Sequence, residues 1–63
     1  MISYEKLRNL MTERGISSKQ LSEMAGIDEG TAGKFKKDAM VRLDVIIAVC
    51  AALGCKIDDI LDY

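Results

Sequence analysis

The chain of 63 residues contains no histidine, no proline and no tryptophan, and only 5% of its residues are aromatic. Without histidine it lacks the commonest metal ligand and the usual general base, so the composition argues against most enzymes and predicts no metal site. Without proline, glycines mark the helix ends, and Gly15, Gly26 and Gly54 fall at helix-length intervals. This spacing, in a chain with no visible repeat, favours an all-helical fold.

Cysteine is also scarce. Cys50 and Cys55 are the only two, and without histidine they cannot complete a four-ligand zinc site within one chain. We expect Cys50, which lies in an apolar run, to be a small core residue and Cys55 to be a partly buried thiol. A redox role for the cysteines is the alternative.

Long hydrophobic runs are missing as well. The longest uncharged apolar stretch, Val45–Cys55, is shorter than the roughly 20 residues that span a bilayer, and no basic-then-apolar leader opens the chain. A content of 49% hydrophobic and 30% charged residues is typical of a globular protein, and the length fits a single domain, residues 1–63. We therefore expect a cytoplasmic protein with no cofactor and no small-molecule substrate.

The net charge of −1 hides an uneven distribution. Residues 1–37 carry seven Lys or Arg against five Asp or Glu, whereas residues 38–63 carry two against five. A polyanion such as DNA would therefore bind the first 37 residues, and the acidic C-terminal part would point away from it.

Apolar spacing and capping residues predict five short helices. The first is expected at about residues 3–14, with Ser3 as its cap. The second, at about 18–25, begins with a Ser17–Gln20 capping box, and the third, at about 28–37, begins at Asp28. The fourth runs from Leu43 to Leu53, with an inward stripe of Leu43, Ile46, Ile47, Cys50 and Leu53. The tail, with Ile57, Ile60 and Leu61, forms a fifth.

The fourth predicted helix has no polar residue between Val45 and Leu53, and it therefore carries a second apolar face. We expect this face to pack against a second copy of the chain, so that Val49→Lys leaves a folded monomer but splits the dimer. The alternative is that the first or the fifth helix covers it. The face consists of Val45, Ala48, Val49 and Ala52.

Seven residues of the second and third helices and the turn between them match a known pattern: Leu21, Ser22, Ala25, Gly26, Ile27, Ala32 and Phe35. On these residues the chain resembles the Cro/CI-type, or XRE-like, helix-turn-helix family of phage and bacterial repressors, and the resemblance covers residues 3–62. It implies a compact, five-helix, lambda-repressor-like domain that regulates transcription by binding duplex DNA. The first four residues, Met-Ile-Ser-Tyr, also resemble the start of small stand-alone transcriptional regulators of this family.

In that family the second helix rests its N-terminus on a phosphate and the third helix lies in the major groove. The resemblance therefore implies phosphate contacts at Ser17, Ser18, Lys36 and Lys37. It implies groove-facing positions at Asp28, Glu29, Gly30, Gly33 and Lys34, and Thr31 lies in the same turn.

The third helix departs from the family pattern. Asp28 and Glu29 bring negative charge to the DNA side, Gly30 and Gly33 offer no side chain to a base, and Asp38 stands where the family often has glycine. An interaction or dimerisation module with little DNA binding is therefore the alternative function. Residues 30–34 superficially resemble a nucleotide-binding phosphate loop. That interpretation fails because the first glycine of the motif would fall on Asp28, and Phe35 replaces its Ser or Thr.

Overall fold

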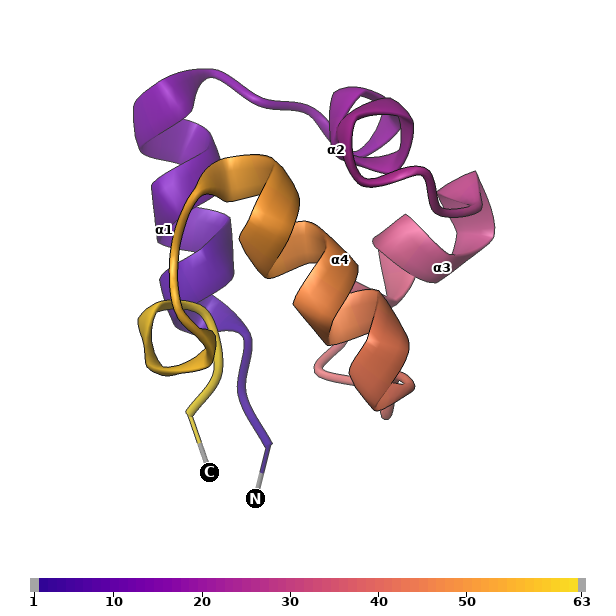
Figure 1. Ribbon diagram of the computed structural model, residues 1–63. Helices are drawn as coiled ribbons and strands as arrows, with labels where there is room; N and C mark the ends of the chain where they lie inside the picture. Colours follow the sequence, from indigo (N-terminus) through magenta and orange to yellow (C-terminus); the bar gives the residue numbers. More distant parts are fainter. Residues whose placement is uncertain (1, 63) are drawn as a thin grey trace.

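The computed structural model describes residues 2–62, which form four α-helices and two single turns of 3₁₀-helix. Figure 1 shows α4 in the middle of the molecule, with α1 on one side and α2 and α3 on the other. Ser3 and Asp62 pair through two backbone hydrogen bonds of 2.8 and 2.9 Å, so the first and last described segments run side by side. The elements are α1 (Glu5–Arg14), α2 (Ser18–Ala25), α3 (Glu29–Gly33), η1 (Lys34–Lys36), α4 (Leu43–Leu53) and η2 (Ile57–Asp59).

The all-helical prediction is confirmed, but the count of five helices is wrong. The tail forms only the 3₁₀ turn η2, closed by a 3.1 Å bond from the Ile60 N–H to the Ile57 carbonyl. The next residues extend to pair with Ser3, which prevents the turn from continuing as a helix. No helix among residues 2–62 is long and apolar enough to cross a membrane.

Local signals placed most helix ends correctly. The glycines 15, 26 and 54 all adopt left-handed backbone angles, with φ of 65°, 67° and 66°. The Ser17 Oγ accepts from the Gln20 N–H at 3.1 Å, and the Gln20 Oε1 accepts from the Ser17 N–H at 2.9 Å, which completes the predicted capping box. The first helix begins at Glu5, two residues later than expected, because Ser3 is engaged in the pairing with Asp62.

The core gathers residues from every helix and from the tail. The Tyr4 and Phe35 rings meet edge to face at 4.8 Å between centroids, an arrangement that aromatic pairs favour. Ser22 is buried, and its hydroxyl donates to the Lys19 carbonyl at 2.6 Å, so its polar atom is satisfied within α2. The buried apolar residues are Tyr4, Leu7, Leu21, Ala32, Phe35, Ile46, Val49, Cys50, Leu53 and Ile60.

The buried face of α4 differs from the predicted stripe. Leu43 and Ile47, predicted to point inward, are 63% and 53% exposed, whereas Val49, predicted on the outer face, is 0% exposed. Apart from Asp44 in its first turn, α4 has only apolar residues, so its sequence contains little from which to infer the inward direction. The packing of α4 against its neighbours sets that direction.

Candidate nucleic-acid interface

A tight turn joins α2 to α3. The Ile27 N–H donates to the Ser22 carbonyl at 2.9 Å across the left-handed Gly26. One residue later the Asp28 carboxylate accepts from the Thr31 N–H at 3.3 Å and caps α3, as the sequence predicts. Ala32 is buried, so α3 is held against the body of the protein while its other residues remain at the surface. Two short helices are thereby fixed in a helix-turn-helix.

The α-helical part of α3 ends at Gly33, whereas the sequence predicted one helix over residues 28–37. The chain continues as the 3₁₀ turn η1, and Asp38 then takes a left-handed φ of 56°. Two glycines in five residues weaken the α-helix, and 3₁₀ turns are common where helices end. The tighter turn also changes the directions in which the lysines of η1 project.

None of the ten predicted contact residues is buried. Seven are exposed and three are half-buried, so all of them have surface available to a ligand. The exposed ones are Ser17, Asp28, Glu29, Gly30, Lys34, Lys36 and Lys37, and the half-buried ones are Ser18, Thr31 and Gly33.

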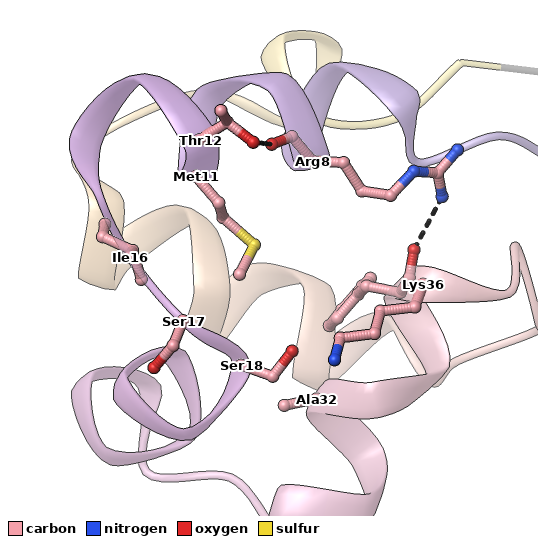
Figure 2. Close-up of a pocket in the computed structure, with 9 residues that line it drawn as sticks. Arg8, Met11, Thr12, Ile16, Ser17, Ser18, Ala32 and Lys36 are labelled. Atoms are coloured by element: carbon pink, nitrogen blue, oxygen red, sulfur yellow. Dashed lines mark hydrogen bonds between the residues drawn. The ribbon is translucent and has the colours of Figure 1, made fainter.

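A hollow of about 320 Å³ brings part of this set together, between α1, the start of α2 and the end of α3. Ser17, Ser18 and Lys36 are on its lining, although Lys36 is far from the serines in the sequence. Figure 2 shows the Lys36 side chain reaching across the hollow toward Ser18. A hydroxyl and an ammonium facing one space offer a hydrogen-bond donor and a positive charge to an anion such as a phosphate.

Arg8 and Thr12 of α1 also line this hollow, and neither is among the residues predicted from the sequence. The Arg8 Nη1 donates to the Phe35 carbonyl and to the Asp38 carboxylate, each at 2.8 Å (Figure 2 shows the first of these). Arg8 thereby ties α1 to the end of η1. One signal was present in the sequence: an aspartate in place of the family's usual glycine has a carboxylate that needs a partner.

Asp38 is the non-glycine residue with a left-handed backbone among residues 2–62. Aspartate tolerates this conformation better than most residues, because its short side chain can bond nearby groups. Its Oδ1 accepts from Arg8 and from the Tyr4 N–H, the latter at 2.8 Å. The Arg8 hydrogen bond first, and the Tyr4 N–H second, lower the pKa of this carboxyl. Its charge is therefore paired with Arg8 rather than free beside the lysines.

Because the pKa of Asp38 is lowered in the folded state, the free energy of unfolding should decrease as the pH falls. Because the folded state holds the carboxylate, its stabilising effect is complete above the ordinary aspartate pKa. It is lost as the pH falls below about 4 and through the folded pKa. We expect the urea midpoint to fall over this range more steeply in the wild type than in Asp38→Asn, which keeps an acceptor for Tyr4. Equal acid dependence of the two proteins would exclude this pair as a contributor.

The lysines of η1 and the residue after it form no ion pair with an acidic side chain among residues 2–62. Within residues 2–62 the ion pairs are Arg8–Asp38 at 2.8 Å and Arg42–Asp44 at 2.9 Å, so Lys34, Lys36 and Lys37 have no acidic partner there. All three are exposed. Free ammonium groups next to a helix-turn-helix are suited to phosphate contacts, which position a protein on a duplex.

The two glycines of α3 differ in the space around them. A methyl group at Gly33 would meet nothing within 4 Å, whereas at Gly30 it would lie 3.0 Å from the Asp28 Oδ2. Because Gly33 has helical angles, φ −64° and ψ −23°, we expect Gly33→Ala to raise the free energy of unfolding by about 0.5–1 kcal/mol. Gly30→Ala should gain less, since it disturbs the cap. Urea denaturation of both variants tests this, and a less stable Gly33→Ala would contradict it.

Comparison with known proteins gives two similarities. A model of the Cro/C1-type HTH DNA-binding domain matches residues 6–63. A solved structure described as a crystal structure of the transcriptional regulator VanUg, form II, is 34% identical and superimposes with a TM-score of 0.86. The alignment covers 97% of this chain and 81% of that one. No curated protein matches the chain.

Proposed function

The chain belongs to the Cro/C1-type helix-turn-helix DNA-binding family, and on that premise we propose that it is a cytoplasmic transcriptional regulator, acting as a repressor that occupies an operator. It does so by binding duplex DNA with α3 in the major groove. The observation that carries the proposal is the capped α2–Gly26–α3 turn, which anchors α3 through Ala32 and leaves its outer side exposed. A regulator of this kind acts by occupancy and needs no catalytic group.

Each part of this surface has a distinct role. Ser17 and Ser18 place the N-terminus of α2 against one phosphate, while Lys36 and Lys37 contact the backbone beyond α3. Asp28, Glu29, Gly30, Thr31, Gly33 and Lys34 face the groove, where a glutamate can accept a hydrogen bond from the amino group of cytosine. Because two of these six positions have no side chain, phosphate contacts supply most of the affinity, and binding falls steeply with salt.

An amide NMR titration with a short mixed-sequence duplex at low salt tests the proposal. We expect shifts at Ser18, at residues 29–34 and at Lys37, and we expect them to fade as salt is added. If these amides stay unchanged in a folded protein while the duplex is in excess, α3 does not enter the groove. The alternative function, an interaction module that pairs with another protein, would then account for the fold.

We further propose that two copies of the chain pair through α4, on a face that differs from the one predicted. Val49 is inside the core, and Val45, Ala48 and Ala52 are only half-buried. The exposed large apolar residues on α4 and just before it are Met40, Leu43 and Ile47, at 76%, 63% and 53%. Arg42 and Asp44 lie among these residues but pair with each other at 2.9 Å, so a twofold pairing of this face need not bury an unpaired charge.

Sedimentation of Ile47→Lys tests the pairing, with Met24→Lys as the matched control. Met24 is an exposed apolar residue of a different helix, α2, and is 49% accessible. We expect the wild type and Met24→Lys to show a mass that rises with concentration, and Ile47→Lys to remain a monomer. A wild type that is monomeric throughout would exclude the pairing and leave DNA binding to single copies.

A further inference from the structure

The C-terminal end of α4 brings the two cysteines together. Gly54 turns the chain left-handed, and the Cys55 N–H donates back to the Cys50 carbonyl at 3.0 Å. This bond across a left-handed glycine is that of a Schellman motif, in which the two bonded residues usually make a hydrophobic side-chain contact. Here both of those residues are cysteines, so we expect the cap to bring the two side chains close together.

The thiols have different surroundings. Both are free, and Cys50 is buried at 8% exposure while Cys55 is half-buried and packs against the core cluster that contains Cys50. Burial raises the pKa of the Cys50 thiol, and the adjacent Cys55 thiol raises it further. A raised pKa makes Cys50 a poor first nucleophile, because the thiolate is the reactive form.

Cys55 is the thiol that solution reaches first. It lines an open hollow of about 480 Å³ together with Lys6 and Arg14 of α1, whereas Cys50 is not on its lining. A small oxidant therefore meets Cys55 at the surface, while Cys50 is buried in the core cluster against which Cys55 packs. This is the arrangement of an attacking and a resolving cysteine.

We propose that Cys50 and Cys55 form a modification site at which hydrogen peroxide produces an intrachain disulfide. The Cys55 thiolate attacks one peroxide oxygen, the O–O bond breaks, and hydroxide leaves and takes up a proton, which converts Cys55 to a sulfenic acid. The Cys50 sulfur then attacks the Cys55 sulfur. The S–S bond forms, the S–O bond breaks, and water leaves with the Cys50 proton. In sum, two thiols are oxidised, one peroxide is reduced and two water molecules form.

The two cysteines are at the end of α4, outside the residues proposed to contact DNA. The native cap already holds their backbones together. Disulfide formation therefore preserves the fold. It also consumes the sulfenic acid on Cys55 before that group reacts with a second chain or oxidises further.

Treatment of the folded, full chain with hydrogen peroxide, followed by intact mass and non-reducing peptide mapping, tests the proposal. We expect a monomer lighter by two hydrogen atoms with Cys50 linked to Cys55. We expect Cys50→Ala to give oxygenated Cys55 or cross-linked dimers instead. A wild type that gives those same products without the intrachain bond would overturn the proposal.

Thermal melting gives a second readout that does not depend on a variant folding. Because the disulfide restricts the unfolded chain, the oxidised protein should melt at least about 5 °C higher than the reduced one. A thiol reductant should reverse the change, which separates it from oxidation of the four methionines. A lower melting temperature in the oxidised protein would show that the native cap cannot hold the bond, and would refute the site.

Discussion

Val49→Lys is expected to unfold the protein. The Val49 side chain is 0% exposed and packs in the core cluster of α4 with Ile46, Cys50 and Leu53. A lysine there must either bury an unpaired ammonium or lose its proton to become a neutral amine. Either change costs several kcal/mol of folding free energy. A domain of 63 residues has a total stability of roughly 3–5 kcal/mol from its core, so the folded population should be lost.

Ile47→Lys is the matched control, because it places the same side chain on the same helix only two residues away. Ile47 is 53% exposed, so we expect its free energy of unfolding to change by no more than about 0.5 kcal/mol. Circular dichroism and urea denaturation at low protein concentration, where pairing of copies does not contribute, measure both variants. A folded Val49→Lys monomer would restore the original prediction that Val49 faces a partner.

Removal of the two lysine charges at the end of η1 is expected to weaken DNA binding strongly. We expect Lys36→Gln with Lys37→Gln to reduce affinity about 10- to 60-fold near 0.1 M salt. It should also make the slope of log affinity against log salt shallower by about 1.8, which corresponds to two lost phosphate contacts. Both lysines are exposed and have no acidic partner within residues 2–62, so their replacement should leave the fold intact.

The control for this experiment makes the same change in net charge elsewhere. Lys6 lies on α1, where its Nζ donates to the Asp58 carbonyl at 3.2 Å, and Lys56 lies between α4 and η2. The double change of these two lysines to glutamine should alter affinity by less than about threefold, because only long-range charge is lost. Fluorescence anisotropy with a labelled duplex across a salt series measures both. Equal losses in the two double variants would contradict phosphate contacts at Lys36 and Lys37.

Interactions between residues close in the sequence made much of the fold predictable. The capping box at Ser17, the Asp28 cap and the glycine stops each depend on backbone groups within a few residues, and the structure contains all of them. Both limits of α2 and the C-terminal end of α4 follow from these signals, whereas Arg42 makes no side-chain cap at the start of α4. The family, too, could be identified from seven residues around the α2–α3 turn, because the close crossing of those helices demands small and apolar side chains at fixed spacing.

Only the tertiary structure decided which face of each element is used. The outward direction of Ile47 and the replacement of a fifth helix by η2 both depend on contacts between distant segments. The Arg8–Asp38 pair joins residues 30 apart and sets the end of η1, and no periodicity reveals it. Hydrophobic and capping patterns specify where a helix begins and ends, whereas packing decides the inward face of a helix in which almost every residue is apolar.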